Sequence, residues 1–229
     1  MPRIARIVIE GLPHHITQRG NDRSQVFFSD EDRERYLSWL KEQSDKHHLE
    51  VHGYCLMTNH VHIVATPHIP ESLALAIGRT NFRYAQRVNR MQGRSGHVWQ
   101  NRFYSCAMDN WHYWRAMRYI EQNPVRAHIV RSPCEYLWSS AAAHIGILDS
   151  SNILDLKEWH KSVADLDWET ILQENLSEEM LMNIRMHTKT GRPWMDDSFL
   201  DRLETEMGRR LRPLSRGRPK NNRAEPDEE

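Results

Sequence analysis

Four short stretches of the chain are predicted to be β-strands, and an alternation of apolar and polar residues marks one of them. The clearest stretch is residues 60–66 (HVHIVAT), in which His60 and His62 lie on one face and apolar residues lie on the other. A two-residue turn at residues 58–59 predicts that this strand forms a hairpin with the strand before it. The predicted strands cover residues 14–19, 51–57, 60–66 and 97–108.

Helical periodicity predicts three helices between and after these strands. Ser29, followed three residues later by Asp32, resembles a capping box at the start of the first helix. Pro124 stops the third helix or kinks its end, because proline lacks the backbone N–H that a helix interior needs. The predicted helices cover residues 30–48, 71–92 and 111–122.

The order strand, helix, strand, strand, helix, strand, helix favours an α+β fold over residues 1–145. We expect a ferredoxin-like antiparallel sheet with the helices packed on one face. Residues 146–208 predict a mainly helical C-terminal extension, and residues 209–229 a basic and then acidic tail that we expect to be flexible. The helices expected in the extension are residues 168–174, 177–187 and 196–207.

The composition limits the class of protein. Of the 229 residues, 39% are hydrophobic and 27% are charged, which is typical of a globular protein. No apolar run approaches the length of a membrane span, and the N-terminal residues lack the apolar core of a secretion signal. Cys55, Cys106 and Cys134 form no CxxC pattern, so we expect reduced thiols in a cytoplasmic protein. No glycine-rich phosphate loop is present, so no nucleotide cofactor is expected.

Positive charge is concentrated locally, although the formal net charge is zero. Residues 79–102 contain six arginines and residues 209–223 contain seven basic residues, and neither segment contains an acidic residue. The arginines between Arg79 and Arg94 recur at helical spacing and share a stripe about 80° wide if the helix extends that far. Such a stripe is either a solvated helix face or a phosphate-binding surface, and its single sign favours phosphate contact.

Two further features suggest contact with nucleic acid, each with a simpler alternative. Trp99 and Phe103 flank Arg102, and they would either stack on unpaired bases or face the core. The Gly-Arg-Pro sequences at residues 191–193 and 217–219 either are plain basic segments or lie in a minor groove. The candidate nucleic-acid-binding residues are Arg19, Arg79, Arg83, Arg87, Arg90, Arg94, Arg102, Arg216, Arg218 and Lys220.

Two histidines, a tyrosine and an asparagine form the candidate catalytic group. His60 and His62 make a platform for a divalent metal, although a chain with 14 histidines also contains pairs that bind nothing. Tyr119 is either a core residue of an amphipathic helix or a nucleophile. Asn123 follows one turn later and either ends the helix or gives its carbonyl oxygen to the same metal, a donor that suits magnesium or manganese.

Several of these segments, in this order, resemble the REP-associated tyrosine transposases, which belong to the HUH single-tyrosine transposase superfamily. The resemblance covers nearly the whole chain and is most specific over residues 15–131. It rests on residues 15–21 (HITQRGN), 57–62 (MTNHVH), 98–103 (VWQNRF) and 118–127 (RYIEQNPVRA), with residues 191–193 (GRP) and 216–220 (RGRPK) in the C-terminal part.

The resemblance implies a mechanism and a substrate. His60 and His62 hold a divalent metal, Mg²⁺ or Mn²⁺, with Asn123 as a third ligand. The Tyr119 hydroxyl attacks phosphorus, and a 5′-phosphotyrosine forms while a 3′-hydroxyl leaves. The implied substrate is single-stranded DNA near a hairpin of the REP type, acted on by a bacterial, nucleoid-associated protein. The arginine stripe and the tail are the candidates for holding that hairpin.

Two other functions are compatible with the same residues. A relaxase or replication initiator would share the metal and the tyrosine, but relaxases commonly use three histidines and an N-terminal tyrosine, whereas Tyr119 lies downstream of the histidine pair. A non-catalytic regulator on the same fold would bind hairpin DNA or RNA without cleaving it. The presence of His60, His62 and Tyr119 counts against the regulator.

Overall fold

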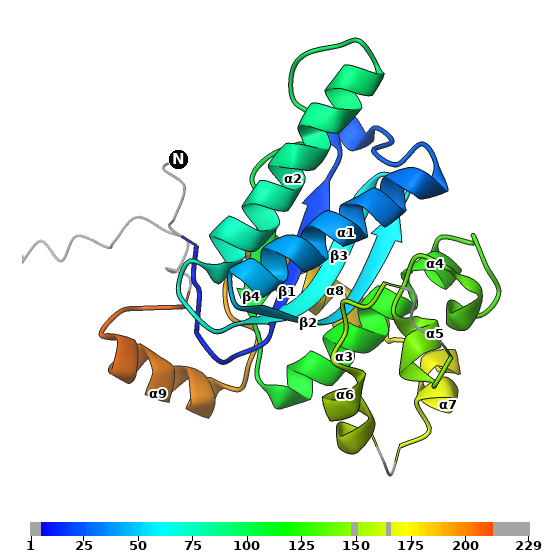
Figure 1. The fold of residues 1–229 in the computed structure, drawn as a ribbon. Coiled ribbons are helices and arrows are strands. Elements are labelled where there is room, and N and C mark those ends of the chain that lie inside the picture. Colours follow the sequence, from blue (N-terminus) through cyan, green and yellow to red (C-terminus); the bar gives the residue numbers. More distant parts are fainter. Residues whose placement is uncertain (1–5, 148–150, 164–165, 213–229) are drawn as a thin grey trace, which may run out of the picture.

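A four-stranded antiparallel sheet forms the centre of the molecule (Figure 1). The computed structural model describes residues 6–147, 151–163 and 166–212. All neighbouring strands are antiparallel, so the predicted α+β fold with an antiparallel sheet is confirmed. The strands are β1 (His14–Arg19), β2 (Leu49–Met57), β3 (His60–Pro67) and β4 (Tyr104–Ala107), in the spatial order β2–β3–β1–β4.

The fourth strand is shorter than its sequence pattern predicted. It begins at Tyr104, whereas the pattern predicted a start at residue 97. Val98, Trp99 and Phe103 are all buried in the same core cluster. Because neighbouring residues of a strand point to opposite faces, Val98 and Trp99 cannot both enter one core from a regular strand. This segment therefore runs irregularly into β4.

Helices α1 (Asp30–Lys46) and α2 (Ser72–Met91) cover one face of the sheet (Figure 1). The predicted cap of α1 is present, because the Ser29 hydroxyl accepts a hydrogen bond from the backbone N–H of Asp32 at 3.3 Å. The apolar side of β3 faces these helices, as its alternation predicted. The fully buried residues of this core include Ile16, Tyr36, Leu40, Val61, Ile63, Leu73, Ile77 and Tyr84.

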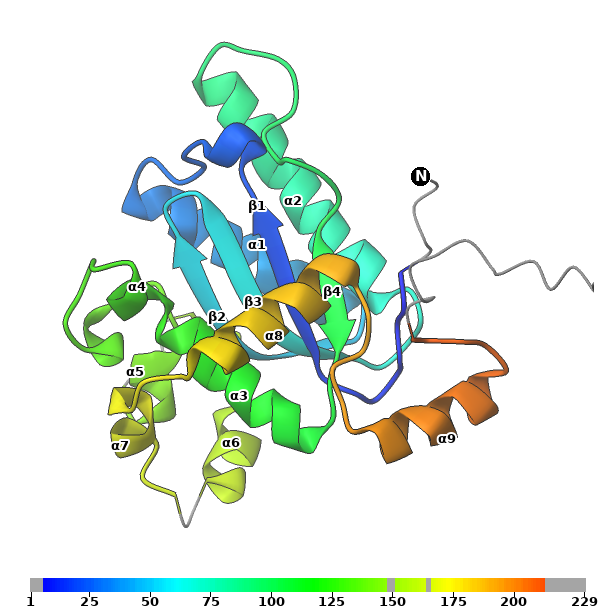
Figure 2. The same cartoon turned by 180° about the vertical axis from the view of Figure 1, so that it is seen from behind.

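Helices α3 (Asn110–Glu121) and α8 (Glu178–Thr190) cover the opposite face (Figure 2). The expectation that the helices pack on one face is therefore corrected, since α1 and α2 form one layer and α3 and α8 form a second. The second layer exists because the histidine-bearing face of the sheet also carries apolar side chains, which need cover. Cys55, Val64 and Cys106 lie on that face and are fully buried.

The C-terminal extension packs on this second face instead of standing apart. Helix α7 (Trp168–Gln173) contacts α3, and α8 contacts β1 and β4. Together with α9 (Asp197–Met207), these are the three helices expected in the extension. No helix in the described ranges is long and apolar enough to cross a membrane. The shorter elements are α4 (Asn123–Arg126), α5 (Ala141–His144), α6 (Leu156–Ser162) and 3₁₀ turns at Asn21–Arg23 and Pro133–Glu135.

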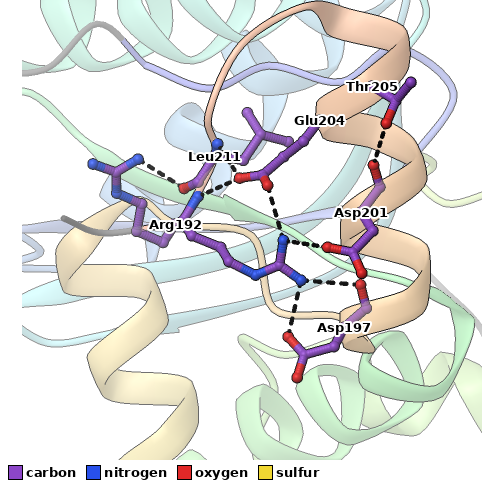
Figure 3. Close-up of polar contacts among 7 residues, drawn as sticks. Arg192, Asp197, Asp201, Glu204, Thr205 and Leu211 are labelled. Carbon is purple, nitrogen blue, oxygen red and sulfur yellow. Dashed lines mark hydrogen bonds and ion pairs between the residues drawn. The ribbon is translucent and has the colours of Figure 1, made fainter. Parts of the chain in front are cut away.

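The segment after α9 turns back and packs against that helix. Leu211 is fully buried, and Arg192 donates a hydrogen bond to its backbone oxygen at 2.7 Å. Gly191, with φ at 68°, ends α8 in the left-handed conformation that glycine adopts readily. The first Gly-Arg-Pro sequence is thus part of a structural turn. Arg212 forms ion pairs with Asp197, Asp201 and Glu204 of α9 (Figure 3).

Candidate active site

The two histidines of the HVH sequence lie on β3, beneath the layer formed by α3 and α8. Strand β1 pairs with β3 and places Arg19 opposite His60 and Thr17 opposite His62. The two imidazole rings have centroids 5.0 Å apart and planes at 83°. His62 is 5% exposed and His60 is half-buried. The structure therefore confirms that both rings share one face of the strand.

Tyr119 and Asn123 approach the histidines from the end of α3. The Tyr119 ring lies edge-on to His62, with centroids 5.5 Å apart, and Tyr119 is 7% exposed. Gln122 keeps helical dihedral angles between α3 and α4, so Asn123 follows Tyr119 by about one turn. The Asn123 Nδ2 atom lies 3.3 Å from His60 Nε2. The structure thus brings together the four residues that the sequence indicated.

Hydrogen bonds to Nδ1 orient both histidine rings. The Nδ1 atom of His60 lies 2.6 Å from Asn59 Oδ1, and an amide oxygen only accepts, so His60 donates its Nδ1–H. Its Nε2 then carries the lone pair that faces Asn123. The Nδ1 atom of His62 lies 2.9 Å from Nε2 of His15 on β1. Each ring is thus fixed by a hydrogen bond at Nδ1, on the side of the ring away from Nε2.

Burial keeps this group of histidines neutral. It lowers the pKa of His15 to about 3 and the pKa of His62 well below its usual value. For His60, burial followed by the positive charge of Arg19 lowers the pKa to about 3. Neutral imidazole is the form that binds a metal ion.

The donors of this site fit a divalent cation. His60 and His62 supply imidazole nitrogens, and Asn123 carries an amide oxygen on the same carbon as its Nδ2. Among the described residues, no group of three or more histidine, cysteine or carboxylate side chains is placed to hold a metal. His60, His62 and Asn123 are therefore the residues that would hold a cation here, through two imidazole nitrogens and one neutral oxygen.

Arg126 lies against Tyr119, a contact that the sequence analysis did not identify. Its guanidinium carbon is 4.4 Å from the centroid of the Tyr119 ring, and its Nη2 donates to the backbone oxygen of Tyr119 at 2.7 Å. Its Nη1 is buried without a hydrogen-bond partner in the described part of the chain. The sequence signal for this contact was the spacing of seven residues between Tyr119 and Arg126, which is about two turns of a helix.

The arginine stripe lies on the other side of the sheet, on α2. The first three arginines of the stripe contact residues in α1 or at its C-terminal end. Arg79 contacts His47, and Arg83 forms an ion pair with Glu42 at 2.8 Å. Arg87 forms ion pairs with Glu31 and the buried Asp32. These pairs make the three less available for phosphate. Arg90 lies in the last turn of α2, and Arg94 lies beyond its end at Met91.

The other candidate contacts with nucleic acid lie in different surroundings. Trp99 and Phe103 are each 8% exposed in the core, so they do not offer faces to unpaired bases. Arg19 and Arg102 are exposed, and within the described ranges their side chains make no hydrogen bond or ion pair. Arg216, Arg218, Lys220 and the second Gly-Arg-Pro sequence lie outside the described residues.

A family model places this arrangement among known proteins. The model described as "Transposase IS200 like" matches residues 9–123, slightly more than half of the chain, from just before β1 to Asn123. The chain belongs to the IS200-like transposase family. The predicted class of enzyme, a transposase, is thus confirmed at the level of the family. No curated protein matches this transposase.

Two solved structures are similar to this chain, and one of them shows the same fold. A structure described as the REP-associated tyrosine transposase bound to a REP hairpin is 20% identical, with a TM-score of 0.51, over 65% of this chain and 89% of that chain. A putative transposase from Deinococcus radiodurans R1 is 20% identical, with a TM-score of 0.37, over 53% of this chain and 97% of that chain. The first likeness shows that this IS200-like transposase shares the fold of the REP-associated protein.

Proposed function

We propose that this transposase cleaves single-stranded DNA beside a hairpin and transfers the strand through Tyr119, with a divalent cation, Mg²⁺ or Mn²⁺, held by His60, His62 and Asn123. The observation that carries the proposal is the approach of Tyr119 to the histidine pair, with 5.5 Å between the ring centroids of Tyr119 and His62. Membership of the transposase family supports the class of reaction, and the geometry supports the choice of these residues.

The proposed reaction exchanges one phosphoester bond for another. The Tyr119 oxygen forms a bond to phosphorus while the bond from phosphorus to the 3′ oxygen breaks. The phenolic proton is lost and the departing 3′ oxygen gains a proton, which leaves a 5′-phosphotyrosine and a free 3′-hydroxyl. A 3′-hydroxyl of another strand then attacks the phosphotyrosine and releases Tyr119. No nucleotide cofactor is needed, because the bond energy is retained in the intermediate.

The groups around Tyr119 suit this chemistry. A cation held by His60, His62 and Asn123 would supply positive charge that polarises the phosphate. Burial keeps the imidazoles of His60 and His62 neutral, and the hydrogen bonds at their Nδ1 atoms fix the orientation of both rings. Arg126 places a second positive charge over the Tyr119 ring, where it stabilises negative charge that gathers on the attacking oxygen and the phosphate.

The proposed substrate rests on the similarity to a hairpin-bound transposase and on the charge near the site. The neighbour with the same fold is described as bound to a REP hairpin. Arg19 is exposed and lies opposite His60, so it is placed to contact the phosphates of a strand that enters the site. Arg90, Arg94 and Arg102 are exposed as well, and we propose them as further phosphate contacts.

The test is a denaturing gel with labelled single-stranded hairpin DNA from beside the gene, in Mn²⁺ or Mg²⁺. The wild-type protein is expected to form a covalent band that disappears in EDTA and in Tyr119→Phe. Tyr104→Phe is the matched control, because Tyr104 is an exposed tyrosine on β4, and it should keep the band.

Each result of this gel decides one point. A covalent band in Tyr119→Phe would show that another residue is the nucleophile. If the wild-type protein binds the hairpin in a native gel but forms no band in Mn²⁺, the protein is a non-catalytic hairpin-binding regulator instead.

A further inference from the structure

A chain of buried hydrogen bonds runs behind the histidine pair and ends in the C-terminal extension. His62 Nδ1 lies 2.9 Å from His15 Nε2, and His15 Nδ1 lies 2.7 Å from Thr188 Oγ1. Thr188 Oγ1 in turn lies 2.7 Å from the backbone oxygen of Ile184. All four residues are at most 5% exposed. The chain thus connects β3 and β1 with α8, which lies outside the segment matched by the family model.

The donor and acceptor of each hydrogen bond follow from the backbone oxygen of Ile184, at which the series ends. A backbone carbonyl oxygen only accepts, so the hydroxyl proton of Thr188 goes to Ile184. Thr188 Oγ1 therefore accepts from the Nδ1–H of His15. In a neutral imidazole the other nitrogen is an acceptor, so His15 Nε2 accepts from the Nδ1–H of His62. The nitrogen of His62 that keeps a lone pair is then Nε2.

The burial of His15 favours the neutral form of its ring, which lies between Thr188 and His62 in the series of hydrogen bonds. It is 1% exposed and forms no ion pair within the described ranges. A charged ring at this position would be a buried cation without a partner, which is costly. A charged His15 would also donate from both nitrogens and force the proton of His62 onto Nε2, the nitrogen that the cation needs.

We propose that His15 and Thr188 are positioning residues that hold His62 in the tautomer with a free Nε2 and so set the cation affinity of the site. The proposal rests on the proposed metal-dependent function. Metal-binding histidines generally donate their second ring N–H to a neighbouring acceptor, which fixes both the tautomer and the orientation of the ring. Asn59 serves His60 in the same way. Helix α8 of the C-terminal extension therefore completes the site through Thr188, which is not one of the proposed cation ligands.

The substitution Thr188→Val removes the hydroxyl while keeping the volume of the side chain. His15 then loses the acceptor of its Nδ1–H, and nothing keeps the proton on that nitrogen. With the proton on Nε2, His15 donates to His62 Nδ1, and His62 carries its own proton on Nε2. A residue that only fills space would leave the protons of His62 where they are.

The first measurement is the tautomer of His62 in the cation-free protein, read from the ¹⁵N chemical shifts of its ring nitrogens. We expect Nδ1–H in the wild-type protein, a mixture or Nε2–H in Thr188→Val, and Nδ1–H again in Thr188→Ser. The matched control is Thr190→Val, because Thr190 is exposed on the same helix and its hydroxyl donates to the Met186 backbone oxygen in the same manner, at 2.9 Å. This control should leave His62 unchanged.

The second measurement is Mn²⁺ affinity by calorimetry, without DNA. We expect Thr188→Val to weaken binding about ten-fold or more, and Thr188→Ser and Thr190→Val to bind like the wild type. The proposal is overturned if the wild-type His62 carries Nε2–H, or if Thr188→Val changes neither the tautomer nor the affinity. Failure of the wild type to bind Mn²⁺ would instead overturn the metal site of the proposed function, and the tautomer measurement would still decide the role of Thr188.

Discussion

Glu121, two residues after the proposed nucleophile, is a buried carboxylate whose replacement by glutamine should destabilise the fold strongly. Its side chain is 0% exposed at the end of α3. One oxygen accepts hydrogen bonds from the Ser140 hydroxyl at 2.6 Å and from His144 Nδ1 at 2.5 Å. The other accepts from the indole N–H of Trp168 at 2.9 Å. The carboxylate therefore ties α3 to the chain around α5 and to α7.

The size of the effect follows from the number of acceptors that glutamine offers. A glutamine has one oxygen, so its NH₂ group must face either the indole N–H of Trp168, which only donates, or Ser140 and His144, which can also accept. In the better orientation the glutamine oxygen accepts from Trp168 and the Ser140 hydroxyl donates to the Tyr54 backbone oxygen, 3.3 Å away. The proton of His144 then moves to Nε2, which is buried without a hydrogen-bond partner among the described residues. At about 1–3 kcal/mol for this buried unsatisfied donor, and about 1 kcal/mol more because hydrogen bonds to a charged carboxylate become neutral ones, Glu121→Gln should lower the free energy of unfolding by about 2–4 kcal/mol. This loss is a large part of the total free energy of unfolding of a typical protein, which is about 5–15 kcal/mol.

The assay is urea unfolding followed by tryptophan fluorescence. Trp168 and Trp159, two of the eight tryptophans of the chain, pack on each other with ring centroids 5.1 Å apart, and Trp168 bonds to Glu121, so part of the signal comes from this region. The control is Glu174→Gln, which removes the charge of an exposed partner of Arg118 and should change stability by less than about 0.5 kcal/mol. A Glu121→Gln protein as stable as that control would refute the reasoning, because it would mean that the buried donors are satisfied in another way.

Two further predictions concern acid stability and Arg126. Burial lowers the pKa of His15 to about 3, whereas an unfolded histidine titrates near about 6.5, so below pH 6.5 the unfolded chain binds a proton that the folded chain does not. His15 alone should therefore cost about 2 kcal/mol of unfolding free energy between pH 6.5 and 5, and a urea midpoint that stays constant over this range would contradict the assignment. Arg126→Met should slow covalent adduct formation by about 100-fold or more while hairpin binding in a native gel persists, and an unchanged single-turnover rate would exclude the proposed charge stabilisation.

The positions of the helices and strands were largely predictable because local signals mark them. The predicted and observed bounds of β1 agree, with the turn signal at residues 20–21 marking its end, and the Ser29 cap marks the start of α1. The second helical layer was not predictable in this way, because alternation shows which residues share a face and not whether both faces are covered. In β2, every residue from Gly53 to Met57 is buried, because α1 packs on one side of the strand and α3 on the other.

The candidate site was predictable where its residues are close in sequence. His60 and His62 follow the period of a strand, and Tyr119 and Asn123 follow the period of a helix. His15 was missed because its partner Thr188 is 173 residues away, and no local pattern shows such a contact. The arginine stripe could be predicted from the helical spacing of its residues. Its pairing with the carboxylates of α1 could not, because it depends on how α1 and α2 pack together.

The segment matched by the family model ends at Asn123, but the face that bears the site is closed by later residues. Ile184 and Leu181 of α8 and Trp168 of α7 belong to the core cluster that also contains Tyr119. Trp168 holds the carboxylate of Glu121, and α8 supplies Thr188 behind the histidines. A fragment limited to the matched segment would leave this apolar face and the buried carboxylate without their partners. The unit that positions Tyr119 in this protein therefore extends at least through α8.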